Sequence, residues 1–344
     1  MADPRVSLAL RARRAGGVGL SELAAALGLT PAALRRGLAD LERAGFTLER
    51  HPTEGIRLVS GPAALDAAEI AADLDVRRVG RRVRCEGTGA STNDLAWAAL
   101  AASPAEADGL AVFAEYQTAG RGRRGSRWLA PPHEAILCSV ALVVEAPPPG
   151  AAVLTRAAAV AAAEAIEAEA EFDRPRSIGI KWPNDLVVDD RKVGGILVEG
   201  RAAGAAGGGV VIGIGINCGQ DSQAFPAAIR PHVASLAMMD ASADRTLLAR
   251  RLLERLDRAV ALTVAADGLE TIRQGAARRC RTLGCRITVA EGETTLTGQV
   301  ADLDPDYGLV LRLPDGALRR FPAMTTTVLS AGGPGRGRKT RGKP

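Results

Sequence analysis

The sequence predicts a mixed α/β protein with a helical N-terminal part and a small all-β C-terminal part. Three observations support this class. Two helix patterns follow one another across a short turn near the N-terminus, and a hairpin pattern at 46–59 comes after them. Apolar strand patterns alternate with helix patterns between about 80 and 279. Five short alternating runs then occupy residues 285–328, which is typical of a small β-barrel.

These changes of pattern divide the chain into five segments. Gly61-Pro62 marks the first boundary, and the Gly- and Pro-rich sequence after residue 330 marks the last. The predicted segments are a helix-turn-helix domain at 1–62, a linker helix at 63–80, an α/β domain at 81–279, a small barrel at 280–330 and a disordered basic tail at 331–344.

The N-terminal segment resembles a winged helix-turn-helix. Helices are predicted at 5–15, at 21–28 and from 31 to Gly45, with Thr30-Pro31 as an N-cap followed by a proline at the first helical position. The alternating runs 46–50 and 56–59 form the wing. Arg35 and Arg36 are the candidate DNA-binding residues, with Arg50 and Arg57 on the wing. The alternative is a winged helix that serves only packing or protein contacts.

The remaining elements follow from local periodicity and from turn residues. The linker helix is expected over 63–75. Strands are predicted at 82–86, 110–116, 135–144, 178–182, 186–188, 193–199 and 210–216. Further helices are predicted from the 91–93 turn to about 102 and at 151–170, 245–265 and 268–279. The closing run of about 45 residues is expected to form an SH3-like barrel.

Composition places the chain among ordinary globular proteins, with 47% apolar and 24% charged residues in 344. Its net charge of +5 equals the charge of the tail 331–344, which holds five Lys or Arg and no acid, so basicity alone does not indicate nucleic-acid binding. Five cysteines without a CxxC pair predict a reducing compartment and neither disulfides nor zinc. Without a signal peptide or a membrane-spanning apolar run, we expect a cytoplasmic protein with no membrane partner.

The loop 120–128, GRGRRGSRW, is the centre of the predicted site. Its glycines allow the backbone to approach a ligand, and its four arginines supply donors suited to phosphate and carboxylate oxygens. Trp128 offers an apolar face for a ring. Taken alone, such a run is equally typical of a solvated basic loop.

Further polar stretches lie at predicted strand ends, where α/β sheets present binding loops. They are STN at 91–93, KWPND at 181–185, KVGGIL at 192–197 and GIGIN at 213–217. Each has a plainer explanation as an N-cap, a surface turn or close strand packing. Together they favour a ligand with an apolar body and a carboxylate that is joined to a nucleotide, with Asp185 available to Mg²⁺.

In this order and spacing, STN, GRGRRGxxW, KWPNDL, RKVGGILVE and GIGIN resemble the biotin–protein ligase family. With its N-terminal domain, the chain resembles the bifunctional bacterial members that also repress the biotin operon. The resemblance implies a seven-stranded mixed sheet of the class II synthetase type, and 81–279 as the catalytic domain. It also implies biotin and ATP as substrates with Mg²⁺, a homodimer, operator DNA, and the biotin carboxyl-carrier domain of acetyl-CoA carboxylase or a related carboxylase as acceptor.

The resemblance also assigns site residues by motif position. The biotin-binding residues are Ser91, Thr92, Asn93, Gln117, Gly120, Arg121, Gly122, Arg123, Lys192, Gly195, Leu197, Gly213 and Gly215. The residues around ATP and the adenylate are Arg123, Arg124, Trp128, Asn184, Asp185 and Asn217. The catalytic residues are Lys192, Arg123, Lys181 and Asp185.

The chain departs from the family pattern in its last strand, where 324–328 reads MTTTV instead of a Gly-Glu-Val/Ile-Ser type of sequence. Three other functions remain open: a lipoate-type ligase, a biotin sensor without catalysis, and a biotin ligase whose winged helix does not bind DNA. The GRGRRG and KWPND sequences argue against the first, and the intact Lys192 and Asp185 argue against the second.

Overall fold

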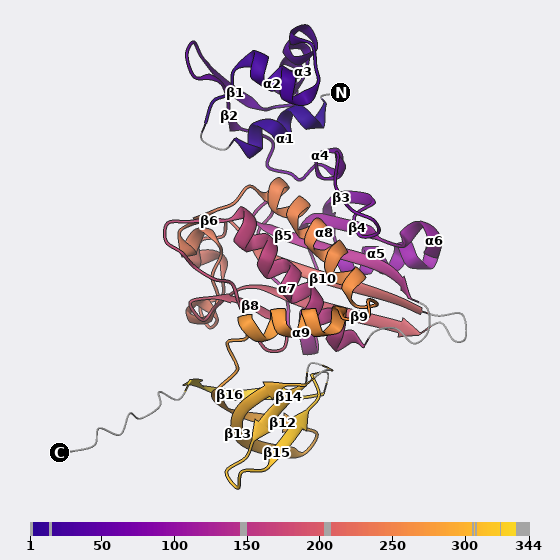
Figure 1. Ribbon diagram of the computed structural model, residues 1–344, viewed down its shortest axis with the longest axis vertical. Helices are drawn as coiled ribbons and strands as arrows, with labels where there is room; N and C mark the ends of the chain where they lie inside the picture. Colours follow the sequence, from indigo (N-terminus) through magenta and orange to yellow (C-terminus); the bar gives the residue numbers. More distant parts are fainter. Residues whose placement is uncertain are drawn as a thin grey trace, which may run out of the picture.

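Three parts follow one another along the long axis of the molecule, as Figure 1 shows for this computed structural model. A helical part with a hairpin lies at one end, a sheet flanked by helices lies in the middle, and a small sheet lies at the other end. The structure describes residues 3–13, 16–144, 150–202, 208–304, 306, 308–323 and 325–334. None of the helices within these residues is long and apolar enough to span a membrane.

The N-terminal part consists of three helices and a two-stranded hairpin: α1 (Pro4–Ala12), α2 (Leu20–Leu27), α3 (Pro31–Arg43), β1 (Thr47–His51) and β2 (Gly55–Ser60). The predicted cap before α3 is confirmed, because the Thr30 side chain accepts a hydrogen bond from the backbone N–H of Ala33. The second helix starts at Leu20 after Gly19, which provides no side-chain cap, so the predicted start at Ser21 is one residue late.

The linker helix predicted over 63–75 is wrong in extent, since α4 covers only Ala67–Ala71. Side chains from distant parts of the chain form hydrogen bonds with backbone groups that would be bonded within a longer helix. The buried Glu115 carboxylate accepts the N–H of Leu65, and the Arg250 guanidinium donates to the carbonyls of Glu69, Ile70 and Ala72. Helix propensity of an Ala-rich run is a weak preference that such contacts override.

An ion-pair cluster joins the N-terminal part to the middle of the molecule. The Arg11 guanidinium on α1 lies 2.7 Å from a carboxylate oxygen of Asp244 and 3.2 Å from one of Glu69. The Arg11 side chain is only 10% exposed, so its charge depends on these two partners.

Seven strands form the central sheet in the order β3-β4-β5-β10-β9-β8-β7. β3 and β4 run parallel and the other neighbouring pairs run antiparallel, so the predicted mixed sheet is confirmed. The strands are β3 (Arg82–Gly89), β4 (Leu110–Gln117), β5 (Ala135–Val144), β7 (Gly179–Lys181), β8 (Asp185–Val188), β9 (Arg191–Ala202) and β10 (Gly208–Asn217). A two-stranded pair lies apart from it, β6 (Glu171–Phe172) with β11 (Ala241–Ser242).

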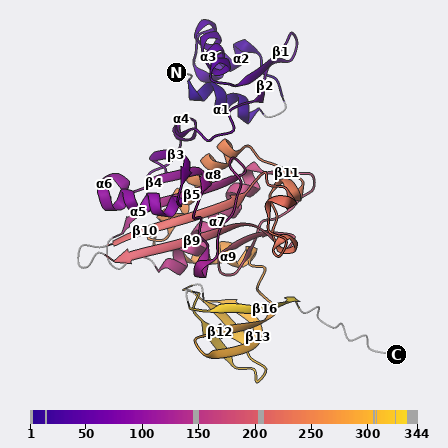
Figure 2. The same ribbon diagram turned by 180° about the vertical axis from the view of Figure 1, so that it is seen from behind.

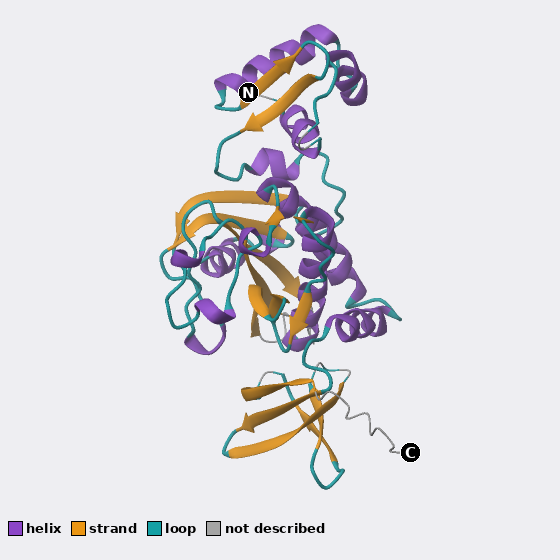
Figure 3. Cartoon of the chain, turned by 90° about the vertical axis from the view of Figure 1, so that its left-hand side faces the viewer, coloured by secondary structure: helices purple, strands orange, loops and turns teal. Residues whose placement is uncertain are grey.

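Helices cover both faces of this sheet (Figure 3). α7 (Ala151–Glu169) and α8 (Arg245–Leu262) pack on one face, and α5 (Thr92–Ala102) with α6 (Pro104–Ala107) packs on the other. Successive strand residues therefore enter different cores: Phe113 packs with α7 and α8, whereas Val112 packs with α5. Viewed from behind, β9 and β10 lie in front of α7 (Figure 2).

The C-terminal part follows α9 (Gly268–Arg279) as a five-stranded antiparallel sheet in the order β15-β14-β13-β12-β16. Its strands are β12 (Cys285–Glu291), β13 (Thr294–Leu303), β14 (Leu309–Arg312), β15 (Leu318–Phe321) and β16 (Thr327–Pro334). The predicted five strands are confirmed; their classification as an SH3-like barrel stays a prediction. β16 extends four residues into the predicted tail, and 335–344 lie outside the described residues.

Candidate functional site

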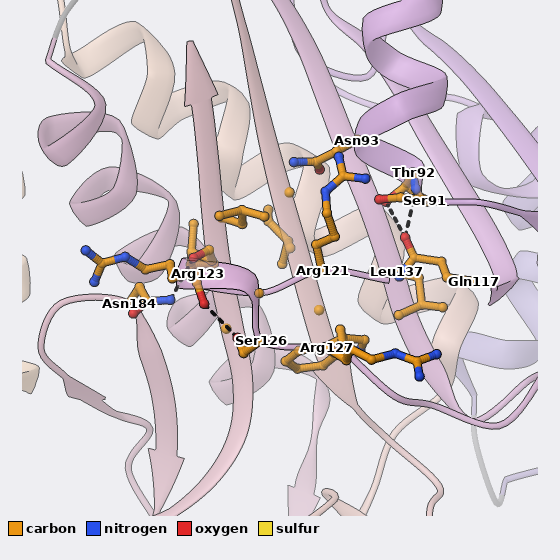
Figure 4. Close-up of a pocket in the computed structure, with 18 of the residues that line it drawn as sticks. Ser91, Thr92, Asn93, Gln117, Arg121, Arg123, Ser126, Arg127, Leu137 and Asn184 are labelled. Carbon is orange, nitrogen blue, oxygen red and sulfur yellow. Dashed lines mark hydrogen bonds between the residues drawn. The ribbon is translucent and has the colours of Figure 1, made fainter. Parts of the chain in front are cut away.

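A cavity of about 250 Å³ opens where the N-terminus of α5, the arginine loop and strands β8, β9 and β10 meet (Figure 4). Most of the residues that the sequence assigned to a site share this one cavity. They are Ser91, Thr92, Asn93, Gln117, Arg121, Gly122, Arg123, Trp128, Asn184, Asp185, Lys192, Gly195, Leu197, Gly213 and Gly215. The structure therefore brings together motifs that lie more than a hundred residues apart in the chain.

Hydrogen-bonded polar groups form the wall of the cavity next to α5. The Gln117 side-chain oxygen accepts the backbone N–H of Thr92 at 2.7 Å and the Thr92 hydroxyl at 3.2 Å (Figure 4). Ser139 on β5 has its hydroxyl oxygen 2.7 Å from the Thr92 hydroxyl and 2.6 Å from the Asn93 amide oxygen. Asn93 is 4% exposed and Ser139 is fully buried, so this wall is rigidly defined.

Glycines on the strands are required by close approach of neighbouring side chains. A Cβ on Gly213 would lie 2.3 Å from the Asn93 amide oxygen, and one on Gly215 would lie 2.5 Å from the Trp128 ring. A Cβ on Gly195 would be within 3.4 Å of both Lys192 and Trp128. The predicted slot along these strands is thus partly filled by Trp128 in this structure.

The arginine loop folds back on itself as a tight turn. Gly122 donates to the Ser126 carbonyl at 2.7 Å, and Trp128 donates to the Gly120 carbonyl at 3.0 Å. Gly120 is buried behind the loop, where a Cβ would lie 2.7 Å from the Trp128 carbonyl oxygen. Gly120 therefore shapes the loop without lining the cavity.

Each of three loop arginines has partners within the protein. Arg121 makes a two-pronged ion pair with Asp94 on α5, with both N–O distances at 2.7 Å. Arg123 donates to the Ala323 carbonyl at 2.7 Å. Arg124 donates to the Thr325 carbonyl at 3.1 Å and to the Thr327 hydroxyl. The loop thus joins α5 to the C-terminal sheet.

A lysine and an aspartate border the cavity at strands β8 and β9. The Lys192 ammonium lies 2.6 Å from an Asp185 carboxylate oxygen and 5.7 Å from the centre of a Trp128 ring. Asn184 is held beside them by paired hydrogen bonds with the backbone of Ile196, each 2.9 Å long. The KWPND turn and strand β9 therefore present one cation and one anion together.

Besides Gly120, three predicted residues do not line this cavity. Arg124 lines a neighbouring cavity of about 360 Å³, which shares Arg121, Gly122 and Arg123 with the first. Lys181 is exposed at the end of β7. Asn217 is buried, donates to the Ala234 carbonyl and accepts from Gln220, so both ends of its amide already have partners.

Sequence reasoning missed several contributors. Ser126, Arg127, Leu137, Ile196 and Ile214 also line the cavity. Three further side chains do not line the cavity but form hydrogen bonds with residues that do: Asp94, Ser139 and Glu199. A serine inside the apolar strand 135–144 was a usable signal for Ser139, because a buried hydroxyl needs a partner. Glu199 was present in the sequence analysis only as the last residue of the RKVGGILVE motif, with no role assigned, and no local pattern indicated Asp94.

The described residues contain no group of three or more His, Cys, Asp or Glu side chains that could hold a metal ion. Asp185, the candidate Mg²⁺ ligand, is instead paired with Lys192. Mg²⁺ binding therefore stays a prediction.

Arg35 and Arg36 lie exposed on α3, far from this cavity. On the hairpin, Arg50 pairs with Glu42 at 2.5 Å, and Arg57 pairs with Glu49. These pairs cancel the charge of the wing arginines, which leaves Arg35 and Arg36 as the stronger candidates for phosphate contacts.

The family model described as "Biotin/lipoate A/B protein ligase family" matches residues 88–217, which include the STN, arginine-loop, KWPND and glycine motifs. The "Biotin--[acetyl-CoA-carboxylase] ligase" of Mycobacterium tuberculosis is 34% identical over 227 residues, or 65% of this chain and 80% of that protein.

The "Bifunctional ligase/repressor BirA" of Bacillus spizizenii is 34% identical over 212 residues. That alignment covers 62% of this chain and 63% of the relative, so the chain spans slightly less than two thirds of its length.

Among solved structures, the biotin protein ligase of Aquifex aeolicus in complex with biotin and ATP has the same fold. It superposes with a TM-score of 0.57 at 21% identity, over 72% of this chain and 97% of that one. The motifs gathered in one cavity, the shared fold and the identity to the Mycobacterium enzyme lead to one conclusion: this chain belongs to the biotin protein ligases of the biotin/lipoate A/B protein ligase family.

Proposed function

We propose that this chain joins biotin to ATP as biotinyl-adenylate and then transfers biotin to a lysine of a carboxylase biotin carrier domain. One observation carries the proposal: a polar wall, a glycine-lined slot and several cations share a cavity of about 250 Å³. The Aquifex protein of the same fold is described with biotin and ATP, and the Mycobacterium relative is named for acetyl-CoA carboxylase.

In this proposal the α5 wall binds the polar head of biotin. Ser91, Thr92, Asn93 and Gln117 supply hydroxyl and amide groups, and Gly195, Leu197, Gly213 and Gly215 border the apolar body. For biotin to lie along these glycines, the Trp128 ring must move from its position against Gly215. Its indole N–H is buried and has no hydrogen-bond partner among the described residues, so it is available to a ligand.

The first chemical step joins two anions. A biotin carboxylate oxygen attacks the α-phosphorus of ATP, and the bond to pyrophosphate breaks. Lys192 and Arg123 reduce the repulsion between the carboxylate and the phosphate, and this stabilisation is larger in the transition state than with separate substrates. Arg124, Asn184 and Asp185 are proposed to act around the nucleotide, and Lys181 in catalysis; Asn217 is left out because both ends of its buried amide are already bonded.

In the second step the amine of the acceptor lysine attacks the carbonyl carbon of biotinyl-adenylate, and AMP leaves with the bonding electron pair. The amine loses a proton, and an amide bond forms. Mg²⁺ is proposed to arrive with ATP, where it would offset phosphate charge; Asp185 could supply one oxygen to it.

A mass measurement tests this proposal. The chain is incubated with ATP, biotin and a carrier domain, and we expect the carrier to gain the mass of one biotinyl group on one lysine. Omission of ATP must abolish the gain. A gain with lipoate in place of biotin would identify a lipoate-type ligase, and biotin binding without any mass gain would identify a sensor.

A second proposed function is biotin-dependent repression. Its specific support is the N-terminal arrangement of α2, α3 and a hairpin, which we interpret as a winged helix-turn-helix, with Arg35 and Arg36 exposed on α3. Dimerisation is part of this proposal. β8 pairs with β9 only as far as Gly195, so within the described chain no strand covers the outer edge of β9 from Leu197 to Ala202.

A further inference from the structure

From strand β9, Glu199 contacts two walls of the cavity, the start of α5 and the arginine loop. One of its carboxylate oxygens accepts the Asn93 amide N–H at 2.9 Å and the Trp97 indole N–H at 3.1 Å, both from α5. Its other oxygen lies 3.7 Å from the Arg121 guanidinium on the arginine loop. A single carboxylate thus contacts the helix that bears the STN motif and the loop that bears the cations.

Asn93 extends these contacts from β9 to β5. Its amide nitrogen binds Glu199, and its amide oxygen is 2.6 Å from the buried Ser139 hydroxyl. Ser139 in turn lies 2.7 Å from the Thr92 hydroxyl, which donates to Gln117. The chain of contacts from Glu199 to Gln117 therefore runs from β9 to β4 beneath the start of α5.

The arrangement depends on a carboxylate at position 199 and on a glycine at position 213. At this position one oxygen accepts two N–H groups and a second oxygen attracts a guanidinium. A carboxylate has two acceptor oxygens and a negative charge, so it suits both roles. Asn93 reaches Glu199 by crossing over Gly213, where any side chain would collide with it. Because Asn93 is 4% exposed, loss of its partner would leave an unpaired buried amide.

Arg121 is consequently held by two carboxylates, Asp94 at 2.7 Å and Glu199 at 3.7 Å. Its charge is compensated before any ligand binds. Arg121 then acts as a fixed part of the wall.

We propose that Glu199 is a positioning residue for biotin: through Asn93 and Arg121 it fixes the wall that receives the polar head. This inference rests on the proposed ligase function. It concerns the binding of biotin and predicts no direct effect on ATP.

The test compares steady-state kinetics of adenylate formation in variants of the full chain. Glu199→Ala is expected to raise the KM for biotin about tenfold or more, since it removes two hydrogen bonds to a charged acceptor, while the KM for ATP changes less than twofold. Glu199→Gln keeps an acceptor oxygen for Asn93 and Trp97 but loses the negative charge that faces Arg121, so its biotin KM should rise less than that of Glu199→Ala. Glu199→Asp, shorter by one methylene, should give an intermediate increase.

Arg201→Gln is the matched control. Arg201 lies on the same strand with its guanidinium 4.3 Å from the Trp97 ring centre, so the variant disturbs the same neighbourhood without touching Asn93 or Arg121. Its biotin KM should stay within twofold of wild type. A variant that merely lowers the amount of folded enzyme lowers the maximal rate and leaves KM unchanged.

A biotin KM within twofold of wild type in both Glu199→Ala and Glu199→Asp would overturn the proposal, and so would an equal rise in Arg201→Gln. If Glu199→Ala does not fold, Glu199→Asp decides the question by the same twofold criterion. Absence of adenylate from the wild-type chain would instead reject the ligase function itself.

Discussion

The Lys192 ammonium and the Asp185 carboxylate form an ion pair of 2.6 Å across neighbouring strands at the edge of the cavity. β8 and β9 place the two residues there through an irregular register between Leu186 and Val187. Both were predicted from sequence to act in the reaction, but their pairing was not. Because Lys192 is bound to Asp185, its charge reaches a ligand only when the pair opens or when both contact the ligand.

Replacement of Lys192 with methionine should slow adenylate formation much more than it weakens biotin binding. The cation is expected to stabilise the charge that develops as carboxylate and phosphate join, so we expect a fall in rate of at least about a hundredfold. Pyrophosphate release measures the rate, and calorimetry measures biotin binding. Lys192→Arg retains the charge and serves as the matched variant. An unchanged rate in Lys192→Met would contradict the assigned role.

Replacement of Arg123 with glycine should release activated biotin from the cavity. Arg123 ties the loop to the Ala323 carbonyl, and its loss removes both this tether and a cation near the phosphate. We expect biotin on lysines of bystander proteins, measured by blotting with streptavidin, whereas Arg123→Lys should label fewer of them. If Arg123→Gly labels the carrier domain alone, the loop does not act as a lid.

The Arg121–Asp94 pair should persist well into acid. The Asp94 carboxylate accepts two hydrogen bonds from Arg121, which lower its pKa below the ordinary 3.8. The pKa of Asp94 is lower in the folded protein than in the unfolded chain. The ion pair therefore stabilises the folded protein at pH values above the unfolded-state pKa, and this stabilisation is lost as the pH falls through the folded-state pKa. Proteolysis within the loop should therefore be independent of pH from about 8 to 4 and increase only below 3.8.

Asp94→Asn supplies the comparison for that measurement. It should raise proteolysis within the loop at every pH above the folded-state pKa of Asp94, because an amide cannot replace the ion pair. Increased cleavage of the wild-type loop between pH 6 and 5 would show that another group controls it.

Arg35→Ala combined with Arg36→Ala should weaken DNA binding and make it less sensitive to salt. Each phosphate contact contributes about 0.9 to the slope of log K against log salt, so loss of two should reduce the slope by about 2. Gel shifts on the DNA upstream of the chain's own gene at several salt concentrations measure this. Arg57→Ala is the matched control, since Arg57 is already paired with Glu49. An equal effect of all variants would indicate no specific role for α3.

Biotin and ATP together should increase dimerisation. Ligand that orders the loops beside the uncovered part of β9 reduces the entropy lost when two chains associate. Sedimentation velocity with and without both ligands should show a shift from monomer to dimer, and DNA binding should strengthen in parallel because a dimer reads two half-sites. Monomers under every condition would leave an enzyme whose helical domain has no role in repression.

The order of the elements and most residues of the cavity were predictable from patterns in the amino-acid sequence. Strand and helix periodicity is local, and functional loops follow strand ends, so residue patterns alone were enough to assign Thr92, Arg121 and Lys192 to a site. The five C-terminal strands and the strands at 186–188 and 193–199 were equally local signals.

The pairing of the charged side chains, in contrast, depends on how the chain folds. Asp94 and Glu199 looked like ordinary surface acids in a helix and a strand, yet both contact Arg121. Asn217 turned inward to Gln220 and Ala234, and the linker helix shortened to Ala67–Ala71 under contacts from distant residues. The physical reason is the same in each case: a polar group takes the partner that folding brings near, and that partner lies beyond the range of any local pattern.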